Sequence, residues 1–229
     1  MHVAGVDGCR GGWLCVEERN GAIQGHVFET LSALLDALPT AEIVAIDIPI
    51  GLPEQGRREC DTAARKALSP TRTSSVFPTP VQGILLEERY SDANLKQRNI
   101  DGRGLSRQAF AILPKIRDVN LTLQPNPALQ QRVREIHPEV CFAFWNWGVP
   151  MRHRKSSPAG QREREKLIDA EWPGQRANIL DRLQGHYDID DLNDAFAALW
   201  TARRIANGTA RVLGDQSIDK YGLRMEMWA

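Results

Sequence analysis

The sequence has no apolar run near the length of about 18 residues that a membrane-spanning helix needs. Its first residues, MHVAGVDGCRGGW, lack the positively charged start and the apolar centre of a secretory signal peptide. The four cysteines lie far apart and form no CxxC pair, which argues against a disulfide framework and against a thiolate zinc site. We therefore expect a soluble, cytoplasmic protein with no membrane partner.

The chain also lacks an excess of either charge, because 29 Lys and Arg residues balance 29 Asp and Glu residues. Any binding of nucleic acid must then come from a local patch and not from a global field. Between Arg152 and Lys166, six basic residues stand against two acidic ones. This segment is a candidate contact for a phosphate backbone, although alternating Arg and Glu residues are more often a solvated helix face.

The beginning of the chain predicts a mixed sheet. Three short β-rich stretches are separated by Gly-Gly and Asn-Gly turns, which favours an antiparallel meander. After a short helix capped by Thr30 comes a continuously apolar stretch, which is typical of a strand covered on both faces. We expect it to lie parallel to the first strand. The predicted strands are residues 3–6, 13–17, 22–28, 43–46 and 132–136.

The rest of the chain is mostly helical. At 229 residues, the size fits a single α/β domain, residues 1–229, with an insertion. We place this helical insertion at about residues 51–127, where it could form a wall facing a substrate. The final helix begins near Asp191, and its small apolar residues predict close packing on the sheet. The predicted helices are residues 31–38, 58–68, 105–119, 159–171, 175–184 and 191–207, with a short buried one in CFAFWNW.

Two aspartates follow the two strands that we expect to be parallel neighbours. Asp7 ends the first strand and Asp47 ends the strand at 43–46. Because neighbouring strands lie about 4.8 Å apart, these carboxylates could share one divalent cation. Ligands also bind at the carboxyl ends of strands in open α/β sheets. The alternative is that each aspartate simply ends its strand as a turn residue.

Further carboxylates could converge on the same edge. Glu139 directly follows the strand at 132–136, and Asp191 and Asp194 project from nearly the same face of the final helix. Acidic residues are also favoured in a first helical turn, so Asp190 or Asp191 could simply be the helix cap. If the carboxylates do meet, they need a compensating cation. Mg²⁺ or Mn²⁺ fits best because these hard ions prefer oxygen ligands.

Six segments together resemble a known family. In chain order they are GVDGCRGGW, AIDIPIGLP, RRECDTAAR, SVFPTP, HPEVCFAFW and DDLNDAFAALWTARR, and they resemble the motif series of the DUF429 family. This family consists of predicted nucleases with a ribonuclease H-like fold, and the resemblance extends from Gly5 to about Gly208. It therefore implies a ribonuclease H-like α/β fold with a five-stranded sheet and nuclease activity, although the activity rests on fold analogy.

The resemblance also implies roles for particular residues. Asp7 corresponds to the first-strand aspartate of ribonuclease H-like enzymes, and Asp47 corresponds to the acidic residue that ends the fourth strand. The pair Asp191 and Asp194 is similar to the closing aspartates of Holliday-junction resolvases of this fold. Glu139 belongs to the HPE motif of DUF429, which has no clear counterpart in those resolvases, so it could orient a neighbour or bind substrate.

Four basic residues are the candidates for binding substrate. Arg58 lies on a helix with Asp61, where an ion-pair network that frames the site is favoured over direct catalysis. The substrate-binding candidates are Arg10, Arg58, Lys155 and Arg164.

The leading hypothesis is a divalent-metal-dependent nuclease in which two cations, about 3.5–4 Å apart, promote phosphodiester hydrolysis. Its metal ligands would be Asp7, Asp47, Asp191 and Asp194, and Glu139 would join them as a catalytic residue. A phosphotransferase similar to actin or sugar kinases is an alternative, because those proteins begin with a strand, an aspartate and a glycine-rich turn. A non-catalytic ligand-binding protein on the same fold is the third possibility.

Overall fold

The computed structural model describes all 229 residues and contains a mixed five-stranded sheet with the order β3-β2-β1-β4-β5. The first three strands are an antiparallel meander, and β4 and β5 run parallel to β1. The predicted α/β architecture is confirmed, and this sheet is compatible with the ribonuclease H-like fold. The strands are β1 (His2–Cys9), β2 (Gly12–Arg19), β3 (Ala22–Phe28), β4 (Ile43–Ile46) and β5 (Val133–Glu135).

The strands β1 and β2 are longer than the apolar stretches in the sequence predict. Pairing between β1 and β2 continues past Val6 through Asp7↔Leu14 and Gly8↔Trp13. Backbone hydrogen bonds do not depend on apolar side chains, so the hydrophobic pattern underestimated both strands. Asp7 therefore lies within β1 and not beyond it. The parallel ladder between β1 and β4 still ends at Val6, one residue earlier.

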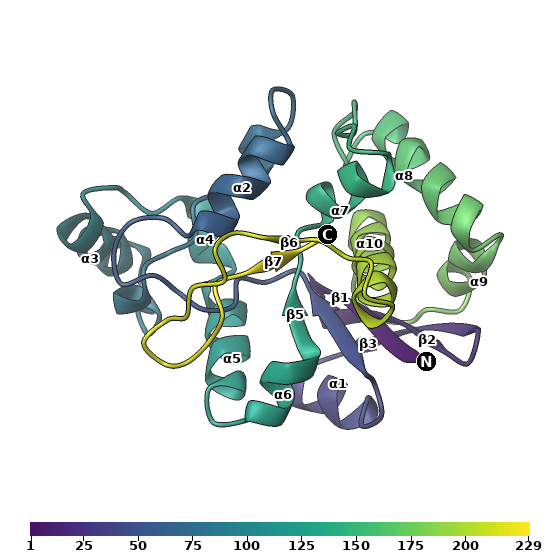
Figure 1. Cartoon of the computed structure of the whole chain (residues 1–229), viewed down its shortest axis with the longest axis horizontal. Helices are drawn as coiled ribbons and strands as arrows, with labels where there is room; N and C mark the ends of the chain where they lie inside the picture. Colours follow the sequence, from purple (N-terminus) through teal and green to yellow (C-terminus); the bar gives the residue numbers. More distant parts are fainter.

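Helices cover both faces of the sheet (Figure 1). One apolar core joins one face of the strands to α1, α4 and α5, and a second joins the other face to α7, α8, α9 and α10. Alternate residues of β1 enter different cores, as strand geometry requires. The helices are α1 (Leu31–Ala37), α2 (Glu59–Ala67), α3 (Tyr90–Asp101), α4 (Arg107–Ala111), α5 (Leu113–Leu123), α6 (Pro127–Arg132), α7 (Pro138–Trp145), α8 (Pro158–Glu171), α9 (Gln175–Leu180) and α10 (Ile189–Ala206).

The close packing predicted for the final helix is confirmed. A Cβ atom on Gly5 of β1 would lie 2.0 Å from the backbone nitrogen of Leu199 and 2.2 Å from the carbonyl oxygen of Ala195 in α10. Only glycine permits this approach of the two backbones. The helix begins earlier than predicted, because Asp188 is its N-cap residue, in place of Asp190 or Asp191.

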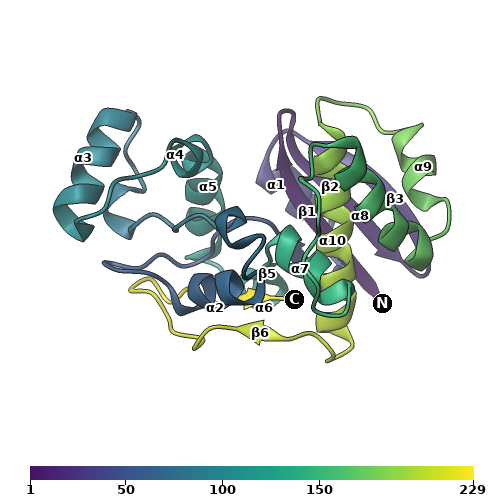
Figure 2. The same cartoon turned by 90° about the horizontal axis from the view of Figure 1, so that it is seen from above.

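The segment between β4 and β5 holds α2 to α6, which lie to one side of the sheet (Figure 2). The single helix predicted at 105–119 is two helices, α4 and α5, which meet at Ile112. The sequence did not predict α3, because only Ala93 and Gln97 of this helix are buried and leave little apolar periodicity. The chain ends with a two-stranded sheet of β6 (Val212–Leu213) and β7 (Met227–Trp228). None of the helices is long and apolar enough to cross a membrane.

Candidate functional site

A cavity of about 420 Å³ opens at the carboxyl ends of β1 and β4. Its walls come from the strand ends, the helices that follow β4, the loop before α8 and the first turns of α10. All five carboxylates that the sequence singled out lie in this one lining, which contains Asp7, Asp47, Glu139, Asp191 and Asp194.

The two strand aspartates lie side by side because of the sheet register. The last parallel pair joins Val6 to Ile46, and the next backbone bond runs from Asp47 N to the carbonyl of Val6 at 3.0 Å. The carboxylate of Asp7 is buried and accepts a hydrogen bond from Gly8 N at 2.8 Å. Parallel pairing thus sets both side chains at the same edge of the sheet.

The close approach of α10 to β1 brings a third aspartate to this edge. Asp194 is only 2% exposed. Asp191, one turn earlier, closes a capping box in which its Oδ2 accepts a hydrogen bond from Asp188 N at 2.8 Å. The two interpretations of Asp191 are therefore compatible, because the residue both supports the helix start and lines the cavity.

Lys155 compensates part of this negative charge. Its ammonium donates a hydrogen bond to Asp194 Oδ2 at 2.6 Å and lies 3.5 Å from Asp190. Burial alone would lower the pKa of Lys155, but Asp194 and Asp7 outweigh this effect and raise it. In this arrangement around the ammonium, no three of the carboxylates bring oxygen atoms within 4.8 Å of one another.

The aspartates are electrostatically strained in the absence of a cation. Burial raises the pKa of Asp7, and repulsion from Asp47 and Asp194 raises it further. Burial and the charge of Asp194 raise the pKa of Asp47 to about 8. Burial also raises the pKa of Asp194, although Lys155 opposes the change. A divalent cation would favour the ionised form of all three.

Glu139 contributes a free oxygen atom to the cavity. Its Oε1 accepts a hydrogen bond from the guanidinium of Arg164, while its Oε2 is buried and has no hydrogen-bond partner. An unpartnered buried carboxylate oxygen is costly, so this atom is a strong potential acceptor at the cavity. Arg164 was a candidate for binding substrate. Its side chain is fully covered, does not line the cavity, and instead positions Glu139 from behind.

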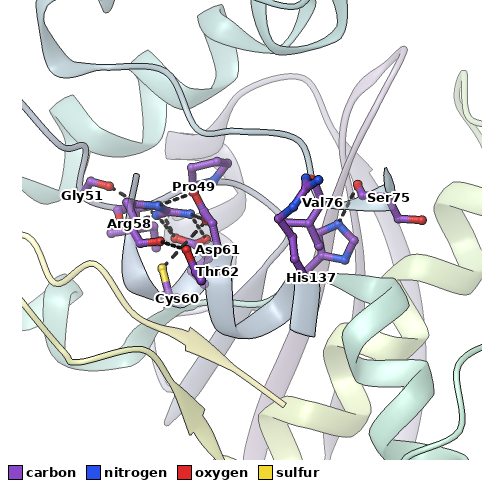
Figure 3. Close-up of polar contacts among 12 residues, drawn as sticks. Pro49, Gly51, Arg58, Cys60, Asp61, Thr62, Ser75, Val76 and His137 are labelled. Atoms are coloured by element: carbon purple, nitrogen blue, oxygen red, sulfur yellow. Dashed lines mark hydrogen bonds and ion pairs between the residues drawn. The ribbon is translucent and has the colours of Figure 1, made fainter. Parts of the chain in front are cut away.

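Arg58 occupies the centre of a buried ion-pair network (Figure 3). Its guanidinium donates hydrogen bonds to Asp61 Oδ1 and to Glu135 Oε1, both at 2.6 Å. It also donates to the carbonyl of Ile50 at 3.0 Å. Burial alone would lower the pKa of Arg58, but the two carboxylates raise it. The network borders the cavity, which agrees with the framing role favoured from the sequence.

The same network explains a second group of potential metal ligands. One ligand atom each from Cys60, Asp61 and Glu135 lies within 4.8 Å of the others. The guanidinium of Arg58 already forms ion pairs with both carboxylates, and burial raises the pKa of the Cys60 thiol, which keeps it protonated. This group therefore has its counter-ion. Glu135 was not among the candidates chosen from the sequence, where its signal is a charged residue within a buried strand.

Of the remaining basic candidates, some line the cavity and others do not. The side chain of Arg10 is 79% exposed, lies 3.5 Å from Asp188 and does not line the cavity. Within the basic segment 152–166, Arg154 and Lys155 line the cavity, whereas the fully buried Arg164 does not. Lys115, a cavity residue from α5, was not among the candidates chosen from the sequence.

Comparison with known proteins gives one result. A family model described as "Protein of unknown function (DUF429)" matches residues 5–218. No curated protein and no solved structure gives a significant match.

Proposed function

The chain belongs to the DUF429 family, whose description assigns no activity, and we propose from the cavity itself that the protein is a divalent-metal-dependent phosphodiesterase acting on nucleic acid. One observation carries this proposal: carboxylates from β1, the end of β4, the start of α7 and the start of α10 line a single cavity. Bringing these carboxylates together costs free energy, because they lose solvation and repel one another. A bound cation would offset this cost.

The donor set fits a hard cation. All the candidate ligands are carboxylate oxygens, which Mg²⁺ and Mn²⁺ prefer, and no histidine or thiolate lies among them. The free Oε2 of Glu139 is an additional oxygen at the same cavity. When bound, the cation supplies Lewis-acid stabilisation of the negative charge that develops on a phosphodiester. The residues that would hold it are Asp7, Asp47, Asp191 and Asp194.

Two residues of the chain have further roles in this proposal. Arg164 holds one oxygen of Glu139, so the other oxygen is fixed as an acceptor for the proton of the attacking water. Lys155 compensates part of the negative charge of the carboxylates in the absence of a cation. With a cation bound among the carboxylates, the ammonium of Lys155 would be available to bind a phosphate oxygen, the role predicted for Lys155 from the sequence.

The proposal is tested by hydrolysis assays with Mn²⁺ at low salt. The substrates are the p-nitrophenyl ester of thymidine 5′-monophosphate, a linear single strand and a linear duplex. We expect metal-dependent hydrolysis of at least one substrate, and Asp7→Asn should lower it at least about a hundredfold because a direct ligand is lost. The matched control is Asp169→Asn, since Asp169 is exposed on α8 and should be dispensable.

Two results would refute the proposal. One is hydrolysis by a folded Asp7→Asn variant at the wild-type rate, and the other is no hydrolysis of any substrate. A parallel titration with Mn²⁺ measures binding directly, because a ligand specific for the native state raises the melting temperature. Neither heat of binding nor a shift in melting temperature would favour the non-catalytic alternative.

A further inference from the structure

Lys115 is a cation on the cavity wall that the proposed metal chemistry leaves unused. It extends from α5 to the turn between β1 and β2, where its ammonium donates a hydrogen bond to the carbonyl of Gly12. The ammonium also lies 4.4 Å from the centre of the Trp13 ring. Its aliphatic chain rests on Gly8, where a Cβ atom would come within 2.8 Å of Lys115 Cδ. Three separate contacts thus fix this side chain beside Gly8, the residue that follows Asp7.

The charge of Lys115 has no counter-ion. No carboxylate lies within 4.0 Å of its ammonium, whereas Lys155 and Arg58 at the same cavity both form ion pairs. Only one of its three N–H donors has a protein acceptor. Burial deprives the charged ammonium of part of its solvation, and this lowers the pKa of Lys115. A half-buried ammonium with free donors at a cavity wall is suited to an anionic ligand.

The dimensions of the cavity limit what that ligand is. A volume of about 420 Å³ is in the range of sites for small molecules, about 300–1,000 Å³. Two of its carboxylates are deeply placed, with Asp7 only 7% and Asp194 only 2% exposed. One wall includes Lys115 of α5, and another comes from the loop before α8 through Arg154, Lys155 and Ser156. Carboxylates at this depth are more accessible to a small ester or to a chain end than to an internal phosphate of a rigid duplex.

We propose that Lys115 binds the phosphate of a nucleotide-sized ester, so that the cavity accepts a mononucleotide ester or the terminal nucleotide of a single strand. The inference rests on the proposed function and specifies its substrate class. In this arrangement the carboxylates hold the cation at the base of the cavity and Lys115 contacts the phosphate from the α5 wall. A nucleoside fills the remaining volume.

The role of Lys115 is tested by the binding of thymidine 5′-monophosphate in the presence of Mn²⁺, measured by calorimetry. We expect Lys115→Met to weaken binding about tenfold or more, as for the loss of one charge-assisted hydrogen bond. Lys115→Arg should restore most of the affinity because it keeps the charge. The control is Lys66→Met, which removes an exposed lysine from α2. Equal affinity in the wild type and a folded Lys115→Met variant would overturn the assignment.

The substrate class is tested with four phosphodiesters in Mn²⁺: the p-nitrophenyl ester of thymidine 5′-monophosphate, a linear single strand, a circular single strand and a closed circular duplex. We expect hydrolysis of the first, the second or both, which also distinguishes the two sources of the ligand. Cleavage of either circle at a comparable rate would overturn this inference and leave the proposed function intact. No hydrolysis of any of the four would refute the proposed function itself.

Discussion

The half-buried carboxyl of Asp47 makes the stability of the cation-free protein depend on pH in an unusual direction. The pKa of Asp47 rises from its ordinary value of 3.8 to about 8 in the folded protein. The folded protein therefore holds this proton more tightly than the unfolded chain does. The resulting stability is fully present below about pH 4 and is lost as the pH rises through about 8. Most acidic groups in proteins act in the opposite sense.

The free energy of this effect follows from the pKa shift of Asp47. At about 1.4 kcal/mol for each pH unit, ionising Asp47 in the folded state costs at most about 6 kcal/mol. Asp47 is only partly buried, and Lys155 opposes the cost, so solvent screening reduces it to about 2–3 kcal/mol. Asp47→Asn removes the charge and keeps the shape of the side chain. In EDTA, the variant should therefore be about 2–3 kcal/mol more stable than the wild type at pH 8 and about equal at pH 4.

Urea denaturation at several pH values between 4 and 8.5 measures this difference. Asp169→Asn, at an exposed position, should leave the pH profile of the wild type unchanged. Saturating Mn²⁺ should reverse the order at pH 8, because the cation stabilises the ionised carboxylates of the wild type and the variant lacks one ligand. If Asp47→Asn is no more stable than the wild type at pH 8 in EDTA, the carboxylates are not strained as described.

Two further predictions concern the framework of the site. Gly5→Ala should destabilise the protein by at least about 3 kcal/mol in urea and weaken Mn²⁺ binding, because a Cβ would collide with the backbone of α10 and push Asp194 away from β1. An unchanged melting temperature would contradict this close approach. Arg58→Met should cost about 3–5 kcal/mol at pH 7, because Asp61 and Glu135 lose their buried counter-ion. If denaturation shows Arg58→Met to be as stable as the wild type, the network does not hold this part of the fold together.

The sequence predicted the sheet well because its signals are local. The Asn-Gly turn occupies left-handed backbone at Asn20 and Gly21, and the strand at residues 43–46 is found with the predicted bounds. The helix cap at Thr30 was also predicted correctly. Patterns with periods of 2 and 3.6 residues depend on neighbours in sequence, so they can be interpreted without the tertiary fold. They do not reveal α3, which buries few apolar residues, or the break between α4 and α5 at Ile112.

The candidate carboxylates could be chosen from the sequence because strand ends and helix starts are local features, and the sheet order then places them at one edge. The partners of those carboxylates depend on long-range contacts. Arg164 was expected to meet substrate, yet it is covered and positions Glu139, and Arg10 is exposed and does not line the cavity. Lys115 reaches the site from α5, more than a hundred residues after the turn that it contacts.

The residue types and their local pattern thus determined a mixed α/β sheet and a set of acidic groups at strand and helix ends. Only the tertiary structure decided which charges meet, because the pairing of charged side chains depends on how remote segments pack and not on their spacing in the chain. The approach of α10 at Gly5, the ammonium of Lys155 among the aspartates and the unpaired ammonium of Lys115 all arise from such packing.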